Sequence, residues 1–163
     1  MASFDAFYRQ SRDSCYRAVI AALGDTEAAA EAMSEAMVRA CGRWDQLATH
    51  PNPEAWVVRT AVNVYRSRWR RWRRSLRLTQ RVDQFTSLPE PFDESLLAAL
   101  KQLSRRQREV VALRVLLDLD TETTATQLGI APGTVTAHLH RALTHLRHSL
   151  TTQNEMEERH ELR

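Results

Sequence analysis

The segment from residue 54 to residue 75 limits the possible fold class more than any other part of this chain. Apolar side chains recur along it at spacings of three and four residues, the period of one helix face, and they are Ala55, Val58, Val62, Tyr65, Trp69 and Trp72. The whole chain has four glycines and five prolines in 163 residues. A β-sandwich or an α/β nucleotide-binding fold needs many more tight turns than these residues support. The sequence therefore predicts an all-α protein.

A polar stripe runs beside the apolar one on the same predicted helix. It repeats at spacings of four and three residues and consists of Arg59, Asn63, Arg66, Arg70 and Arg73. Guanidinium groups suit phosphates, and an Asn amide can hydrogen-bond a base edge. Residues 55–82 hold nine arginines and no acid, although the net charge of the chain is +3. A run of one sign indicates a polyanionic partner, and nucleic acid is the first candidate.

Two further helices are predicted before this segment. The first spans about residues 3–23, and Gly24 is placed to end it in a left-handed conformation. Asp25 can accept hydrogen bonds from the free amides of the second helix. That helix has a core-facing stripe of Met33, Met37, Ala40, Trp44 and Leu47. The prolines in residues 50–53 break the pattern, so a loop of about six to nine residues is expected after Trp44.

The second helix also carries a column of acids. Glu27, Glu31 and Glu35 stand at successive i,i+4 positions, and nothing nearby in the sequence neutralises them. Such a column is either a plain solvent-facing surface or a docking surface for a basic partner.

The second half of the chain begins after a break in the helical pattern. Residues 76–92 lose the helical period and end in two prolines, which indicates a linker and a domain boundary. Leucines at residues 96–103 mark a short helix. Ser104 and Gln107 then form a capping-box start for a helix that runs to about Leu117.

The last two predicted helices form a helix-turn-helix pattern. Asp120 can cap the first of them, which ends at Gly129, and Pro132 opens the second. The buried stripe of this last helix is Val135, Leu139, Ala142 and Leu146. A short helix, a tight turn and a longer helix match the DNA-binding motif whose second helix enters the major groove, although an ordinary helical hairpin has the same outline.

The sequence does not favour an enzyme. Nothing in it resembles a nucleophile elbow, a phosphate-binding glycine loop or paired catalytic carboxylates. The histidines of the last helix point around most of its circumference and do not converge on a metal; they are His138, His140, His145 and His148. We therefore expect no catalytic residue, no cofactor and no metal.

Cysteine use and hydropathy indicate the cellular setting. Cys15 and Cys41 stand far apart, with no zinc-ligand spacing and no disulfide framework, so a reducing cytoplasm is the expected location. No apolar run approaches membrane-spanning length, and no basic start precedes an apolar block. We expect neither secretion nor membrane insertion.

Several runs of this sequence resemble the extracytoplasmic-function sigma factors, the two-domain promoter-recognition subunits of bacterial RNA polymerase. Leu103–Val111, Leu128–Val135 and Leu139–Leu143 are similar to region 4 of that family. Pro53–Arg59 and Ala61–Asn63 resemble the region 2 helix that reads the minus-10 element. The resemblance covers about residues 3–150, with both halves in the family's order.

The resemblance implies a domain plan and a set of partners. Residues 3–75 would be region 2, residues 76–92 the linker, residues 93–150 region 4 and residues 151–163 a charged tail, which we expect to be frayed or disordered. Glu31 and Glu35 would dock on the clamp helices of the largest subunit of core RNA polymerase, and region 4 would lie near the polymerase flap. Promoter DNA is the second implied partner, and an anti-sigma factor is a third that the resemblance allows.

The resemblance also implies which residues contact DNA. The non-template strand of the minus-10 element, with one base flipped out, would be held by the helix 54–75 and the loop 45–53. The helix would contribute Arg59, Asn63, Arg66 and Arg70, and the loop would contribute Asn52. The minus-35 major groove and its backbone would be contacted by Arg114, Thr134, Thr136, Ala137, His140 and Arg141. Few charged donors in this second set favour methyl contacts with thymine.

Two other functions remain open at this point. A two-component or quorum-type transcription regulator has a helix-turn-helix domain like Ser104–Leu146, but it places a sensor domain first, and the N-terminal half here lacks strand alternation and an acidic phosphorylation pocket. A helical RNA or protein adaptor can also contain an arginine-rich helix.

Overall fold

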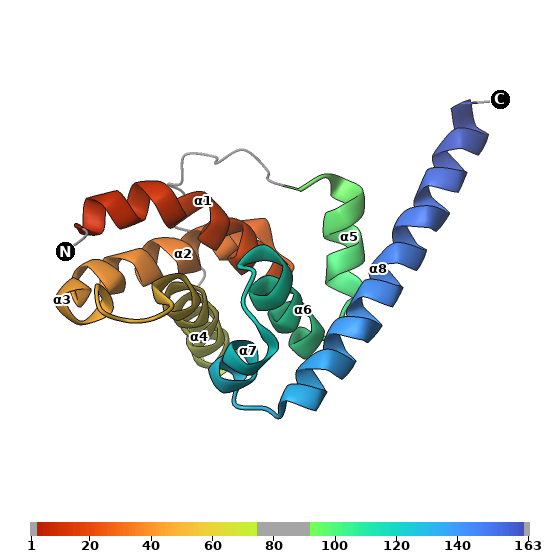
Figure 1. Cartoon of the computed structure of the whole chain (residues 1–163). Helices are drawn as coiled ribbons and strands as arrows, with labels where there is room; N and C mark the ends of the chain where they lie inside the picture. The colour runs from red at the N-terminus through yellow and green to blue at the C-terminus, as the bar shows by residue number, and fades with distance from the viewer. Residues whose placement is uncertain (1–2, 75–91, 162–163) are drawn as a thin grey trace.

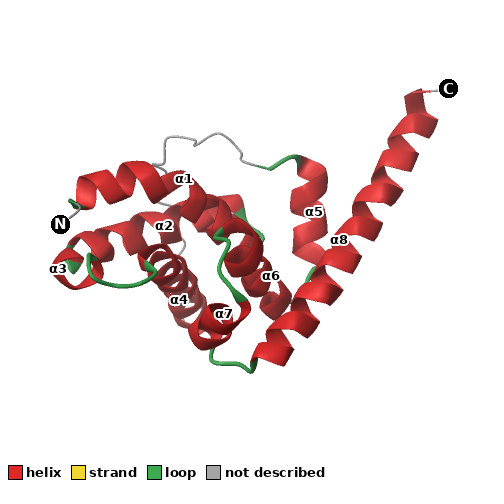
Figure 2. Ribbon diagram, in the orientation of Figure 1, coloured by secondary structure: helices red, strands yellow, loops and turns green. Residues whose placement is uncertain are grey.

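The computed structural model describes residues 3–74 and 92–161, with side chains over most of them, and every regular element in these ranges is helical. The N-terminal half consists of α1 (Phe4–Leu23), α2 (Thr26–Cys41), α3 (Trp44–Leu47) and α4 (Pro53–Arg74). The C-terminal half consists of α5 (Glu94–Gln102), α6 (Arg105–Val111), the π-helical turn η1 (Ala112–Leu116), α7 (Thr121–Leu128) and α8 (Pro132–Glu161). Figures 1 and 2 show the two groups of helices side by side. The predicted all-α class is confirmed.

Most helix ends lie where the capping residues predicted them. Gly24 has φ 70°, and its amide donates to the carbonyl oxygen of Ile20 at 2.7 Å, which closes α1. The Asp25 carboxylate accepts from the amide of Ala28 at 2.9 Å and opens α2. The capping box is present at the start of α6, where Ser104 and Gln107 bond reciprocally at 2.9 and 3.3 Å.

The predicted second helix is divided in two. It ends at Cys41, because Gly42 and Arg43 turn the chain, and Trp44 and Leu47 belong to α3. The following loop spans 48–52 and is shorter than expected. The apolar stripe nevertheless stays inside, since Leu47 is buried and the Trp44 ring lies 4.8 Å from that of Phe7. The apolar spacing therefore continues across the break at Gly42, which is why the pattern predicts one helix where the structure has two.

The apolar stripe of α4 is buried at its start and emerges toward its end. Ala55, Val58 and Val62 are buried and Tyr65 is partly buried, whereas Trp69 is 45% exposed. Trp69 lies beside Ala28 in the first turn of α2, so α2 does not extend far enough to cover it. The side chain of Trp72 lies outside the described residues.

The helix predicted to run from Ser104 to Leu117 changes geometry halfway. After Val111 the chain forms the π-helical turn η1, in which the amide of Leu117 donates to the carbonyl of Ala112 at 3.1 Å. Asp118 then takes φ 50°, a left-handed conformation that Asp tolerates better than most residues. This turn directs the chain back into α7.

The C-terminal residues do not fray at Leu150 as expected. The last helix, α8, continues to Glu161 and projects beyond the rest of the molecule in Figure 1. Residues 147–161 contain no glycine or proline, so nothing in them stops a helix. No helix in the described residues is long and apolar enough to cross a membrane.

A single apolar core continues from one half of the molecule into the other. The end of α1 packs against α6 and η1, and the same cluster holds Ile20 from the first half and Leu113 from the second, both of them almost fully buried. Arg108 of α6 donates from Nε to the carbonyl oxygen of Ala22 at 3.2 Å. The two halves predicted from the sequence are therefore in direct contact.

Two glycines give opposite predictions for stability. Gly24→Ala should lower the free energy of unfolding by about 1 kcal/mol, because an L side chain is strained at φ 70° even though Lys101 and Arg108 leave room for a methyl group. Gly133→Ala, in the first turn of α8 with nothing within 4 Å of a new Cβ, should raise it by about 0.5 kcal/mol. Denaturant unfolding of both variants measures the two changes. Equal effects of the same sign would contradict the backbone argument.

Candidate nucleic-acid interface

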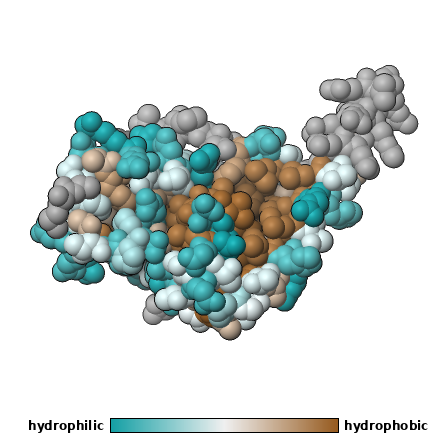
Figure 3. All heavy atoms as spheres, viewed as in Figure 1, coloured by the Kyte–Doolittle hydropathy of each residue, from teal (hydrophilic) through white to brown (hydrophobic). Residues whose placement is uncertain are grey.

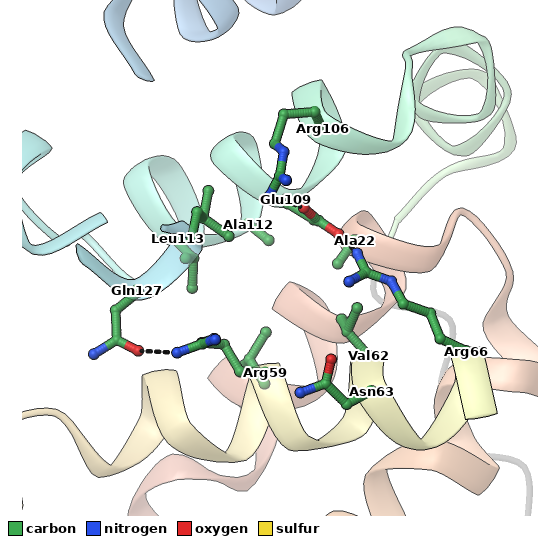
Figure 4. Close-up of a pocket in the computed structure, with 12 residues that line it drawn as sticks. Ala22, Arg59, Val62, Asn63, Arg66, Arg106, Glu109, Ala112, Leu113 and Gln127 are labelled. Atoms are coloured by element: carbon green, nitrogen blue, oxygen red, sulfur yellow. Dashed lines mark hydrogen bonds and ion pairs between the residues drawn. The ribbon is translucent and has the colours of Figure 1, made fainter. Parts of the chain in front are cut away.

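The polar stripe of α4 forms one continuous face. Arg59, Asn63 and Arg70 are exposed and Arg66 is partly buried, while the side chain of Arg73 lies outside the described residues. Figure 4 shows Arg59, Asn63 and Arg66 side by side on α4, all pointing toward α6 and α7. The structure thus brings together the helical part of the predicted minus-10 set.

A cleft of about 130 Å³ separates this face from the C-terminal half. Its floor is apolar, with Val62 on one side and Leu113 on the other. On the α4 side, Arg59 Nη1 donates to Gln127 Oε1 of α7 at 3.3 Å, the bond drawn in Figure 4. Asn63 opens into the cleft between Arg59 and Arg66.

Glu109 is the electrostatic centre of the cleft. Its side chain is 5% exposed, and it forms an ion pair with Arg66 of α4. Arg106 Nη1 lies 2.9 Å from Glu109 Oε2, and Arg105 Nε lies 3.8 Å from Oε1. Burial lowers the pKa of Arg66 to about 10, which leaves its guanidinium charged at neutral pH. Glu109 was not predicted as a site residue, because its partner is 43 residues away along the chain.

A second hollow, of about 460 Å³, lies on the other side of Asn63. It is lined by one arginine of α2, by two residues of the turn that follows α2 and by residues of α4, namely Arg39, Gly42, Arg43, Trp56, Thr60 and Asn63. Cations, one indole and one amide around an open hollow provide groups for a phosphate, a base face and a base edge. The sequence pattern identifies neither Trp56 nor the two arginines as members of one site. The spacing along α4 cannot reveal that Arg39 and Arg43 lie near Asn63, because these arginines come from another part of the chain.

Asn52 lies apart from this group. Its backbone amide donates to His50 Nδ1 at 3.0 Å, and its backbone carbonyl oxygen accepts from the backbone amide of Trp56 at 3.2 Å. Asn52 therefore occupies the start of α4. It does not line either hollow.

The predicted minus-35 residues of α8 share an exposed surface. Thr134, Thr136, His140 and Arg141 are exposed and Ala137 is partly exposed, whereas Val135 and Ala142 are buried on the opposite side. The Thr136 hydroxyl donates to the carbonyl oxygen of Pro132 at 3.2 Å, which leaves its methyl group and an oxygen lone pair outward. Arg114 is not on this surface, because it lies in η1 and its guanidinium donates to the carbonyl of Leu119.

The four histidines His138, His140, His145 and His148 of α8 belong to no cluster of metal-ligating side chains in the described part of the chain. Among the residues that the structure describes, no group of three or more His, Cys, Asp or Glu side chains could hold an ion. His145 bonds Gln102 of α5 at 3.2 Å, and His138 is partly buried with Nδ1 unpartnered. Burial, with Arg141 and Arg106 nearby, lowers the pKa of His138 and favours its neutral form.

Two of the three acids in the α2 column, Glu31 and Glu35, are paired with arginines, which corrects the interpretation of the column as unneutralised. Arg68 of α4 lies 2.8 Å from Glu31 Oε2 and 3.7 Å from Glu35 Oε2. Arg39 lies 2.5 Å from Glu35 Oε1. The arginine run of α4 reaches this column because α4 packs along α2, a contact that spacing along one helix cannot reveal. Beside the column, Val38 is 72% exposed.

Apolar side chains also reach the surface of the C-terminal half. Figure 3 shows them gathered over the middle of the face seen in Figure 1. Val115 of η1 is 51% exposed, and the partly buried leucines that adjoin the core in α5 and around η1 are Leu96, Leu97, Leu116, Leu117 and Leu119. An apolar surface of this kind fits a protein partner.

Comparisons with known proteins identify the family. Residues 7–75 match the family model of sigma-70 region 2, and residues 93–146 match that of sigma-70, region 4. The chain is 32% identical over 155 residues to the RNA polymerase sigma-E factor of Streptomyces avermitilis, covering 93% of this chain and 87% of that one. It is 31% identical over 163 residues to the RNA polymerase sigma-E factor of Streptomyces coelicolor, covering 93% and 88%.

The fold is also similar to a solved structure. The sigma factor RpoE from Bartonella quintana, crystallised with the anti-sigma factor NepR, superposes with a TM-score of 0.72 at 21% identity, covering 91% of this chain and 96% of that one. The helices of both halves thus have counterparts in one sigma factor. With the two family matches and the Streptomyces relatives, this shows that the chain belongs to the sigma-70 family of RNA polymerase sigma factors, in its extracytoplasmic-function group.

Proposed function

We propose that this sigma factor binds core RNA polymerase and directs initiation at promoters by reading a minus-10 element with α4 and a minus-35 element with α8. One observation carries the proposal. Within the residues that match region 2, α4 presents the amide of Asn63 between Arg59 and Arg66, beside an open hollow lined by cations. This arrangement places a group that can read a base between groups that can hold phosphates.

In the minus-10 element, the hollow beside Asn63 would receive a flipped base of the non-template strand. Taking a base out of the stack costs a few kcal/mol. Stacking on an aromatic side chain such as Trp56 returns about 1–3 kcal/mol for each base, and Arg43 can neutralise the adjoining phosphate. Arg70 extends the phosphate-binding face along α4, and Asn52 stays a prediction from the family resemblance.

In the minus-35 element, the start of α8 would lie in the major groove. Thr134, Thr136, His140 and Arg141 are exposed there, and Arg141 can contact a phosphate or a guanine. Ala137 and the Thr136 methyl group suit the methyl group of thymine. Arg114 would reach the DNA backbone only if it released the Leu119 carbonyl, so its role is the least supported of the set.

The polymerase would bind two surfaces. Glu31 and Glu35, with the exposed Val38 beside them, would dock on basic clamp helices of the largest subunit, whose cations would replace Arg68 and Arg39. The apolar surface around Val115 would contact the flap. An anti-sigma factor, like the one bound to the Bartonella protein, would compete for the same surfaces.

The proposed role is one of binding. RNA synthesis belongs to the core enzyme, so the proposal includes no catalytic residue, cofactor or metal, and it places the chain in the cytoplasm with the polymerase. The helix-turn-helix alone would also suit a two-component or quorum-type regulator, but that alternative leaves the region 2 match at residues 7–75 unexplained.

The direct test is run-off transcription with sigma-free core polymerase from the source bacterium and fragmented genomic DNA. We expect discrete RNA starts that share two upstream sequence elements and that depend on the added protein. Transcripts without common elements, from a protein that is folded and binds core enzyme, would refute promoter direction by this chain.

Asn63→Ala should separate promoter opening from polymerase binding. Loss of one base-reading amide is expected to reduce open-complex formation about tenfold, because a good base contact contributes about 1–3 kcal/mol. Affinity for core enzyme should stay unchanged, since the ion pairs of Glu31 and Glu35 are with Arg68 and Arg39 and do not include Asn63. The matched control is Gln10→Ala, an exposed amide on α1. Equal loss of opening and of core binding would contradict the assignment.

Arg70→Ala should change the salt dependence of promoter binding. If Arg70 neutralises one phosphate of a single strand, the slope of log K against log salt should become shallower by about 0.7. Arg9→Ala is the control, because Arg9 is an exposed α1 arginine paired with Asp5 at 2.9 Å. Titration of holoenzyme with promoter DNA at several salt concentrations measures both slopes, and identical slopes for both variants would exclude the phosphate contact.

A further inference from the structure

We propose that the two halves of this sigma factor form a self-masked state, in which α6 and α7 lie across a narrow cleft from the minus-10 face of α4, engage its arginines Arg59 and Arg66, and place Glu109 where a DNA phosphate would bind Arg66. The inference rests on the proposed function of that face. It adds that the free chain is closed at its minus-10 face, and that closure depends on one buried charge pair between the halves.

The charge pair is built as a latch and differs from a surface ion pair. Glu109 is 5% exposed, and the Arg66 side chain that reaches it from α4 is 29% exposed. Arg106 and Arg105 of α6 hold the same carboxylate from its own half. Two α6 arginines would repel Arg66 if Glu109 carried no charge, so the carboxylate decides whether α4 and α6 attract or repel each other.

Further contacts hold the closed state on both sides of the latch. On one side Arg59 bonds Gln127 of α7, and on the other Arg108 donates to the carbonyl oxygen of Ala22 at 3.2 Å. Between them the apolar core continues from α1 into η1. The closed state therefore has apolar, hydrogen-bonded and ionic contacts, of which the ionic one depends on a single residue.

The same contacts occupy the groups that DNA would need. Both arginines next to Asn63 have partners in the C-terminal half, and Asn63 itself lines the narrow cleft of about 130 Å³. A strand can reach Arg66 only after its phosphate displaces Glu109. The exposed surface of α8 is not covered in this way, because Thr136, His140 and Arg141 face outward. Closure thus engages Arg59 and Arg66 of the minus-10 face, while Asn63 itself stays exposed.

Removing the Glu109 charge should open the chain. If the open state is a minor population in the free protein, the apparent affinity for a strand is reduced by that fraction, and opening restores it. For Glu109→Gln, which keeps the side-chain volume, we expect about tenfold tighter binding of a fluorescent oligo-dT, measured without polymerase. Oligo-dT presents phosphates with no promoter sequence, so the result does not depend on the unidentified minus-10 motif.

A distance measurement reports closure independently of DNA. The exposed Cys41 on α2 can be labelled, while Cys15 is buried and its pKa is raised to about 12, so it stays unreactive. A second dye on a cysteine introduced by His148→Cys, an exposed position of α8, gives energy transfer between the halves. Transfer should fall in Glu109→Gln. The control Glu122→Gln removes an exposed acid from α7 and should change neither transfer nor binding beyond a small general charge effect.

A charge reversal separates opening from misfolding. Arg66→Glu and Glu109→Arg should each lower energy transfer, and the double variant should restore it, because the pair is re-formed with opposite signs. Unchanged transfer and unchanged oligo-dT binding in Glu109→Gln would overturn the proposal, as would opening without any gain in binding. Failure of run-off transcription would instead refute the promoter function, while these two measurements would still report on closure.

Discussion

The carboxylate of Glu109 is the constraint on which the relation between the two halves depends. A carboxylate that is 5% exposed loses most of its hydration, and leaving such a charge unpaired costs about 3–5 kcal/mol. Arg106 and Arg105 supply part of the compensation from α6 itself. Arg66 supplies the rest from α4, and this fixes where region 4 sits over region 2. The cleft and the Arg59–Gln127 bond both follow from that placement.

The apolar and ionic contacts between the halves contribute in different ways. Burial of Ile20 and Leu113 in one cluster favours any close approach of α1 and η1, because the hydrophobic effect has no direction. The ion pair favours one register, since Glu109 meets Arg66 only when α6 faces α4 across the cleft at that level. An interface that relied on apolar area alone would be harder to open on demand. One that relies on a buried charge can be weakened by a competing anion.

Many helix ends of this fold follow from local chemistry. Gly24, Asp25, Ser104 and Gly129 mark helix ends because each satisfies backbone groups within four residues of itself. The helix end at Gly42 cannot be recognised from the apolar pattern, because Trp44 and Leu47 keep the same spacing across the break.

Other features depend on contacts between elements. The neutralisation of Glu31 by Arg68, the exposure of Trp69 and the π-helical turn are set by which helix packs where. The α4 stripe could be predicted as a nucleic-acid face, since helical spacing alone places Arg59, Asn63 and Arg66 together. The hollow formed with Arg43 and the cover formed by Glu109 could not, because both partners come from other helices.

The choice of cation matters to the proposed exchange of partners. The chain has 22 arginines and one lysine, the latter at position 101. A guanidinium is planar, presents a fork of donors and binds carboxylate and phosphate in similar geometry, whereas an ammonium acts as a compact, strongly hydrated point charge. Arg66 can therefore exchange the carboxylate oxygen of Glu109 for a phosphate oxygen, and its fork of donors suits a second phosphate oxygen as well. A lysine at the same position would lose directionality in both states. The Arg66 side chain can thus serve both in binding DNA and in closing the molecule. This shared use couples strand binding directly to separation of the two halves.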